Sequence, residues 1–181
     1  HSQSVVEPGE RVEVSKTYEK NIAKYVMMPG NAKKRHPVVE ARLQALTEYA
    51  ETAPINRVEP GEDHKLGIIT SSTSYQYVKE VCGDRYPVMK LGMIWPLPEK
   101  KILDFAASVD KLVIVEELDG FIEDHCRNLG LACVGKSNFS NIDELLPLTV
   151  AAQLSEPWQV GPRLDAAIPP RPPVMCAGCP H

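Results

Sequence analysis

The amino-acid sequence predicts an α/β fold in which a mostly parallel sheet carries helices on both faces. The first observation is a series of short apolar runs, at residues 66–70, 88–91, 112–116 and 132–135. These runs are continuous rather than alternating, which is typical of strands that are buried on both faces. The second observation is that a helix-spaced apolar stripe follows each of the first three runs. Strand–helix–strand units of this length form right-handed crossovers, and such crossovers build a parallel sheet.

Helical periodicity and start and stop signals place the helices of this domain. Gly130 has the position of a cap behind the third helix. Asn141, with Glu144 three residues later, has the spacing of a capping box, so we expect a last helix that starts at residue 141 and breaks or restarts at Pro147. The three earlier helices are predicted over residues 75–82, 98–106 and 120–129.

The residues before this domain have weaker patterns. The apolar run at residues 24–28 is interpreted as a docking arm or an isolated strand. Helical spacing starts after Pro37, which suits a first turn because its missing N–H costs nothing there, and it continues to residue 52. Residues 54–64 contain turn-forming residues and predict a linker or loop. We therefore divide the chain into an N-terminal arm and helix (1–64), an α/β domain (65–153) and a proline-rich C-terminal segment (154–181).

Composition excludes two classes of function. The net charge of −4 and the pI of about 5.8 leave no basic footprint for nucleic acid. Because no apolar stretch approaches the roughly 18 residues of a membrane span, no membrane association is expected. Five cysteines are an odd number, and Cys82, Cys126 and Cys133 sit singly in apolar surroundings. They are interpreted as reduced, mostly buried thiols, which indicates a cytoplasmic protein.

Two polar groups follow predicted strands, at the sheet edge where α/β proteins bind ligands. The Ser/Thr run at residues 70–74 is either a helix cap or a contact to a ligand or partner. The carboxylates of Glu116, Glu117 and Asp119 are either an acid/base group or helix-start charges, and helix-start charges are the simpler interpretation. The loop at residues 92–98 holds Trp95 and two prolines, so it suits a subunit contact or packing on its own domain, and one of its X–Pro bonds could be cis.

A C-x-x-C pair, Cys176 and Cys179, stands at the end of the chain beside His181. Two thiols at this spacing form half of a zinc ribbon, a redox pair or half of an iron–sulfur site. The proline run at residues 169–173 disfavours the redox pair, since a thioredoxin-type pair sits at a strand-to-helix turn. Zinc and iron–sulfur both remain open on these residues. A chain that ends in half a metal site suggests an internal piece of a longer polypeptide.

The final eleven residues, RPPVMCAGCPH, resemble the junction before the thiamine-diphosphate domain in the alpha subunit of the indolepyruvate:ferredoxin oxidoreductases, part of the 2-oxoacid:ferredoxin oxidoreductase family. The usual form in that family is CPGCPH, and Ala177 replaces its proline. Other stretches are also similar to the family, so the resemblance covers nearly the whole chain. They are residues 1–7, 25–29, 66–71, 74–78, 91–98 and 113–117.

The resemblance implies an internal domain similar to the C-terminal domain of transketolase. It implies a parent enzyme that decarboxylates aryl pyruvates oxidatively to acyl-CoA, with thiamine diphosphate, Mg²⁺, [4Fe-4S] clusters and coenzyme A as cofactors. Its partners would be a beta subunit, ferredoxin and the neighbouring domains of its own chain, in an oligomer. Cys176 and Cys179 become candidate cluster ligands. The activating glutamate would lie upstream, so no catalytic residue is assigned in this chain.

The domain by itself is expected to be a structural and subunit-contact domain without activity or bound cofactor. Two alternatives stand beside this expectation. One is a self-contained interaction module whose C-x-x-C binds zinc. The other keeps the thiamine enzyme but changes the substrate to pyruvate or 2-oxoglutarate, because no residue in this sequence identifies the 2-oxoacid.

Overall fold

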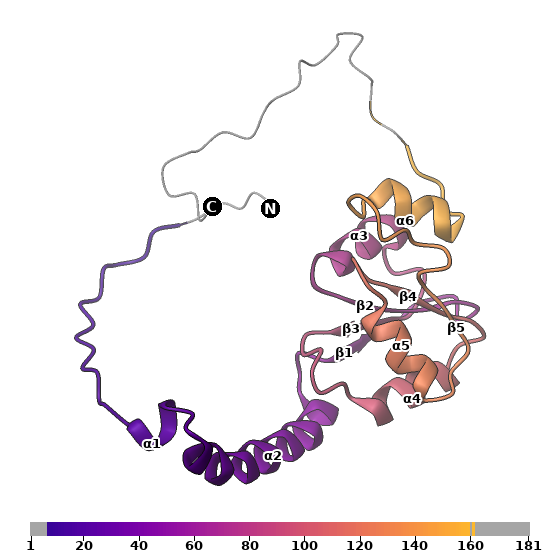
Figure 1. Cartoon of the computed structure of the whole chain (residues 1–181). Helices are drawn as coiled ribbons and strands as arrows, with labels where there is room; N and C mark the ends of the chain where they lie inside the picture. Colours follow the sequence, from indigo (N-terminus) through magenta and orange to yellow (C-terminus); the bar gives the residue numbers. More distant parts are fainter. Residues whose placement is uncertain (1–6, 160, 162–181) are drawn as a thin grey trace. The chain divides into compact units, whose positions relative to one another are not determined.

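The computed structural model describes residues 7–159 and residue 161, and it confirms an α/β fold with a mostly parallel sheet. The chain divides between Leu46 and Thr47 into two compact units. The sheet lies in the second unit and has the strand order β1-β3-β2-β4-β5 (Figure 1). Its strands are β1 (Arg57–Glu59), β2 (Gly67–Ser71), β3 (Val88–Leu91), β4 (Leu112–Val115) and β5 (Cys133–Val134).

The four predicted strands pair in parallel, and helices cover both faces of the sheet. Ile68 and Ile69 are neighbours on β2 and point to opposite faces, so each belongs to a different apolar core. One core holds residues of α3 and α6, and the other holds residues of α4 and α5 (Figure 1). These helices are α3 (Ser72–Cys82), α4 (Glu99–Ala107), α5 (Phe121–Asn128) and α6 (Pro147–Leu154).

The structure corrects the start of the last helix. Residues 141–146 are not helical, because Asp143 has a φ of +67°, which interrupts a right-handed helix. Leu146 takes the N-cap position, and Pro147 opens α6, where its missing N–H is harmless. The predicted capping box was therefore wrong, whereas the restart at Pro147 is confirmed.

The prediction of a loop over residues 54–64 was also partly wrong. Three of its residues form β1, which pairs antiparallel with β3 through the Cα partners Arg57 and Lys90. A three-residue strand is too short to show a periodicity in the sequence. Because β1 joins the same sheet as β3, the sheet begins before residue 65. The domain limits at 65 and 153 otherwise stay a prediction.

The first unit contains α1 (Ile22–Tyr25) and most of α2 (Pro29–Thr52). The run at residues 24–28 is therefore not a strand, since its first residues close the short helix α1. The long helix starts at Pro29 rather than at Pro37, and Pro37 lies inside it. Pro29 suits a first helical position, whereas Pro37 removes one hydrogen bond from the interior of the helix. Within α2 only Ala50 is buried.

The last turn of α2 is attached to the α/β domain by polar groups. The buried side chain of Asn56 donates from Nδ2 to the carbonyl of Ala50 at 3.1 Å. Its Oδ1 accepts from the backbone N–H groups of Gly92 and Met93 at 2.9 and 2.8 Å. The carboxylate of Glu51 accepts from two N–H groups in the first turn of α4. The end of α2, the loop after β3 and the start of α4 thus share one hydrogen-bonded junction.

We expect Asn56→Ala to lower the free energy of unfolding by about 3 kcal/mol, because it leaves two partly buried N–H groups and the carbonyl of the buried Ala50 without these partners. Denaturation by urea, followed by circular dichroism, measures this change. The exposed Asn138 is the matched control, and its replacement by alanine is expected to cost less than about 0.5 kcal/mol. Equal losses at the two positions would contradict the role of Asn56.

Candidate functional site at the carboxyl ends of the strands

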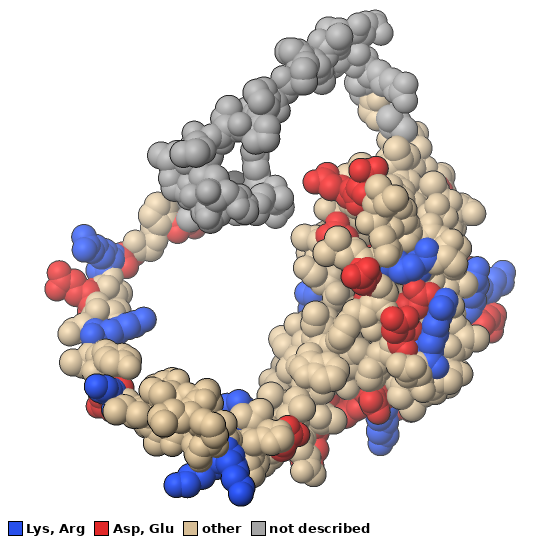
Figure 2. All heavy atoms as spheres, in the orientation of Figure 1, with Lys and Arg blue, Asp and Glu red and all other residues tan. Residues whose placement is uncertain are grey.

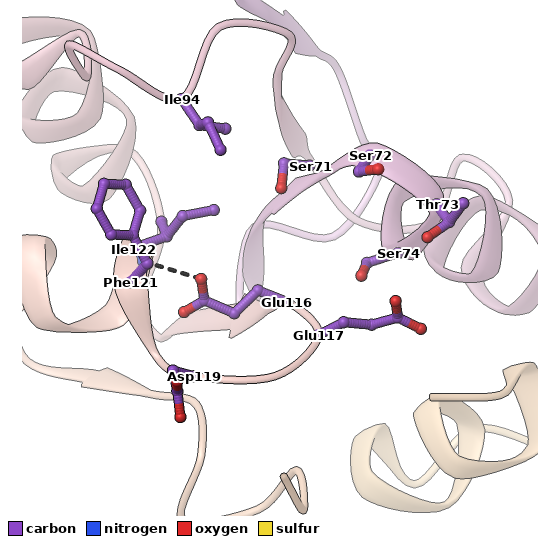
Figure 3. Close-up of a pocket in the computed structure, with 10 residues that line it drawn as sticks. All are labelled: Ser71, Ser72, Thr73, Ser74, Ile94, Glu116, Glu117, Asp119, Phe121 and Ile122. Carbon is purple, nitrogen blue, oxygen red and sulfur yellow. Dashed lines mark hydrogen bonds between the residues drawn. The ribbon is translucent and has the colours of Figure 1, made fainter. Parts of the chain in front are cut away.

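The carboxyl ends of β2 and β4 border a cavity of about 210 Å³ (Figure 3). The sequence predicted a site at this edge, and the structure brings both predicted polar groups to it. Figure 3 shows serine and threonine side chains from the start of α3 on one side and acidic side chains after β4 opposite them. The lining residues are Ser71–Ser74, Ile94, Glu116, Glu117, Asp119, Phe121 and Ile122.

Glu116 is the buried acidic group of this cavity, with only 7% of its surface exposed. Its carboxylate accepts hydrogen bonds from the backbone N–H groups of Ile122 and Glu123 at 2.9 and 3.0 Å. These N–H groups belong to the first turn of α5 and have no partner within the helix. Of the two interpretations drawn from the sequence, the structure supports a helix-start charge for Glu116 rather than an acid/base catalyst.

Burial raises the pKa of the Glu116 carboxyl above its usual value, and the two backbone hydrogen bonds together with the charge of Lys136 oppose this rise. The Lys136 ammonium donates to the carbonyl of Glu116 at 2.6 Å. The N–H of Lys136 donates to the buried carboxylate of Glu123 at 2.7 Å. The carboxylates of Glu116 and Glu123 are therefore held by backbone N–H donors, and Arg127 also pairs with Glu123.

Gly135 is required by the same arrangement. A Cβ at this position would lie 2.5 Å from the carboxyl group of Glu123, which is too close for any other residue without movement. The glycine thus lets the chain after β5 pass against the buried carboxylate of α5.

The Ser/Thr run does not cap α3 in the predicted way. Ser71 takes the N-cap position with an extended backbone, but its hydroxyl makes no capping hydrogen bond. Ser72 has a φ of +49°, an uncommon value for a residue other than glycine. The start of α3 would favour an anion by its dipole, yet three carboxylates line the opposite side of the cavity (Figure 3). A diphosphate group therefore does not fit this cavity, since its charge would face Glu117 and Asp119.

The loop after β3 packs in part on its own domain, and its role as a subunit contact stays a prediction. Pro96 and Leu97 are buried, whereas Ile94 and Trp95 are exposed. The Trp95–Pro96 peptide bond is cis, a state that the sequence left open. The indole ring of Trp95 packs edge-on against Phe121, with 6.1 Å between ring centres. This aromatic pair was not foreseen, because its members are 26 positions apart in the sequence and no local pattern connects them.

The described cysteines are buried or partly buried free thiols. Burial raises the pKa of Cys82 to about 11 and that of Cys126 to about 12. Burial also raises the pKa of Cys133. Among the described residues, no group of three or more His, Cys, Asp or Glu side chains is arranged to hold a metal ion. The predicted ligands Cys176 and Cys179 lie outside the described residues.

Curated proteins of one kind match this chain. Indolepyruvate oxidoreductase subunit IorA of Archaeoglobus fulgidus is 33% identical and covers the whole chain. The subunits of the same name from Thermococcus kodakarensis and Pyrococcus horikoshii are each 28% identical and cover 100% and 91% of it. Over its whole length the chain is thus similar to part of the IorA subunits of indolepyruvate oxidoreductase. It spans about a third of the length of these relatives (32%, 32% and 29%).

A solved structure confirms the fold at lower similarity. It is a 2-oxoglutarate:ferredoxin oxidoreductase from Magnetococcus marinus, determined with 2-oxoglutarate, coenzyme A and succinyl-CoA bound. The match has a TM-score of 0.54 at 16% sequence identity and covers 71% of this chain and 23% of that one. No family model matches the chain. In the described part of the chain, no helix combines the length and the apolar character that a bilayer crossing requires.

The raised pKa of Glu116 predicts the sign of one pH dependence. The folded state binds the Glu116 proton more tightly than the unfolded state does. The contribution of Glu116 to the free energy of unfolding therefore falls as pH rises through and above its usual pKa of 4.5. Glu116→Gln does not titrate. We therefore expect the free energy of unfolding of the unmodified chain to fall relative to that of the variant between about pH 4 and pH 7. Urea denaturation across this range measures the difference, and the opposite slope would contradict the assignment.

Burial and raised pKa also predict slow thiol chemistry. At pH 8 and in the folded state, we expect Cys82 and Cys126 to react with iodoacetamide at least about 100-fold more slowly than in urea, because thiolate is scarce and access is blocked. Peptide mass spectrometry reads the modification at each site. Cys133, which is only partly buried, is the internal control and should react faster than either. Rapid modification of Cys126 in the folded chain would show that this side of the sheet is open.

Proposed function

We propose that this chain is an internal domain of a thiamine-diphosphate and iron–sulfur dependent oxidoreductase that decarboxylates aryl pyruvates oxidatively. Indolepyruvate is the proposed substrate, an acyl-CoA the product and ferredoxin the electron acceptor. The observation that carries this proposal is the match of the whole chain, at 33% identity, to 32% of the IorA subunit of Archaeoglobus fulgidus. The solved 2-oxoglutarate enzyme shares the fold alone and does not favour 2-oxoglutarate as substrate.

Within this enzyme we assign the domain a structural role. The carboxylates of Glu116 and Glu123 are engaged with backbone N–H groups, and this use supports a framework role rather than catalysis. The hydrogen bonds of Asn56 attach the last turn of α2 to the loop after β3, which also supports a framework role. Neighbouring domains of the same polypeptide and a beta subunit are the proposed contacts, and the cytoplasmic location stays a prediction.

Cofactors would be bound mainly outside the described residues. Thiamine diphosphate would supply the carbanion chemistry and [4Fe-4S] clusters the electron path. The described cavity does not fit a diphosphate, and no group of described side chains is arranged to hold a metal ion, so no step of the reaction is assigned to the described residues. Cys176 and Cys179 stay the proposed cluster ligands, by their C-x-x-C spacing and by the family resemblance. Zinc at the same pair is the competing proposal.

The proposal is tested with the full-length alpha subunit, co-expressed anaerobically with its beta subunit. We expect reduction of methyl viologen that depends on coenzyme A and is faster with indolepyruvate than with pyruvate or 2-oxoglutarate. The 181-residue chain alone should give only background reduction. Preference for 2-oxoglutarate would support the alternative substrate, and turnover by the short chain would contradict the structural role.

The cluster ligands need a separate measurement. We expect Cys176→Ser and Cys179→Ser in the full-length protein to lower the iron content by up to one cluster per alpha subunit and to remove one set of cluster signals in electron paramagnetic resonance. Cys133→Ser is the matched control and should leave the iron content unchanged. Stoichiometric zinc in place of iron would support the interaction module instead.

A further inference from the structure

Exposed apolar side chains gather beside the cavity at the carboxyl ends of the strands. Trp95 is 59% exposed and Leu118 is 74% exposed, although both are large apolar residues. Ile94 and Phe121 are about half exposed, and both line the cavity (Figure 3). We call this surface the carboxyl-end face and define it by Ile94, Trp95, Glu117, Leu118, Asp119 and Phe121. The proposed framework role leaves this face unexplained, because none of its apolar groups is needed for the two cores.

The carboxyl-end face is acidic as well as apolar. Glu117 is exposed and, among the described residues, makes no hydrogen bond or ion pair. It also borders a second hollow of about 190 Å³, which includes Asp143 and Glu144. No described lysine or arginine lines either hollow. Acidic side chains are prominent next to α6 in Figure 2. The face thus combines acidic side chains with exposed aromatic ones, and the nearby Lys136 ammonium is engaged by the carbonyl of Glu116.

We propose that the carboxyl-end face is a docking surface for an arginine-bearing, proline-rich segment, and that residues 169–173 of this same polypeptide are its occupant. A guanidinium stacks on aromatic rings such as Trp95 and pairs with carboxylates such as Glu117. Trp95 packs against Phe121, and Phe121 and Glu117 line the same cavity. Proline-rich peptides dock on aromatic surfaces at a low cost in entropy, because their backbone is already restricted. The segment reads Pro-Pro-Arg-Pro-Pro, with Arg171 at its centre. It lies outside the described residues.

The described end of the chain permits this contact. Glu156, just after α6, accepts a hydrogen bond from the Tyr86 hydroxyl at 2.6 Å and pairs with Arg85, so the chain is fixed at this point. Residue 169 follows 13 positions after Glu156. A fully extended chain of this length spans up to about 45 Å. A domain of about 100 residues has a radius of gyration of about 13 Å. Because α6 packs on α3, whose first turn lines the cavity, the tether starts on a neighbouring element.

The test uses a fluorescently labelled peptide of residues 166–175 and the 181-residue chain carrying Arg171→Glu, which disables its own segment. We expect saturable binding in fluorescence anisotropy. Adding Glu117→Lys should weaken the affinity at least about tenfold, since it turns an attraction into a repulsion. Adding Glu80→Lys, the same charge change at an exposed position near the other end of α3, is the matched control and should leave the affinity within about twofold.

A second comparison tests whether the occupant comes from the same chain. The chain with Arg171 intact should bind the labelled peptide at least about fivefold more weakly than the Arg171→Glu chain, because its own tethered segment competes at a high effective concentration. Equal affinities of these two chains would overturn the assignment to residues 169–173. The absence of saturable binding, or equal effects of the Glu117 and Glu80 changes, would overturn the docking surface itself. These measurements need no enzyme activity, so their failure is distinct from a failure of the proposed function.

Discussion

The buried carboxylate of Glu116 is the interaction on which the geometry of the carboxyl ends depends. Burying a charge costs free energy unless strong hydrogen bonds replace its water. Here the first turn of α5 supplies two N–H groups, so one contact ends β4 and begins the helix. The loop between them must therefore turn sharply, and Leu118 adopts a φ of +57° within it. Glu117 and Asp119 are turned outward by that loop, which gives the cavity its acidic side.

Much of the α/β domain could be predicted because its signals are local. The strands at residues 66–70 and 112–116 are continuous apolar runs, and only a sheet buried on both faces accommodates such runs. Gly130 could be recognised as the stop of α5, and it has the positive φ of 82° that favours glycine. The position of the cavity was also predictable, because parallel strands bring their carboxyl ends to one edge.

The features that the sequence did not predict depend on contacts between residues far apart in the chain. No pattern in the sequence indicated that Asn56 joins α2 to the loop at Gly92, which is 36 positions away. The short strand β1 exists because β3 offers an edge with which to pair, and three residues carry no periodicity. The capping-box pattern at Asn141 failed because tertiary packing, with Leu145 buried in a core, outweighed a local preference. Cys176 and Cys179 were singled out by spacing and by family resemblance, which do not distinguish iron from zinc.

The two edges of the sheet have a consequence for how this domain meets its neighbours. Edge strands invite pairing with foreign strands unless they are short or charged. Strand β5 has two residues, and β1 has three, two of which form the ion pair Arg57–Glu59. The hydroxyl of Tyr75 donates to Glu59 and holds that pair against α3. Neither edge offers a template for a longer, continuous sheet, which protects the domain from strand-mediated aggregation. Any partner of this domain must therefore recognise it by side-chain chemistry and shape rather than by shared β-structure.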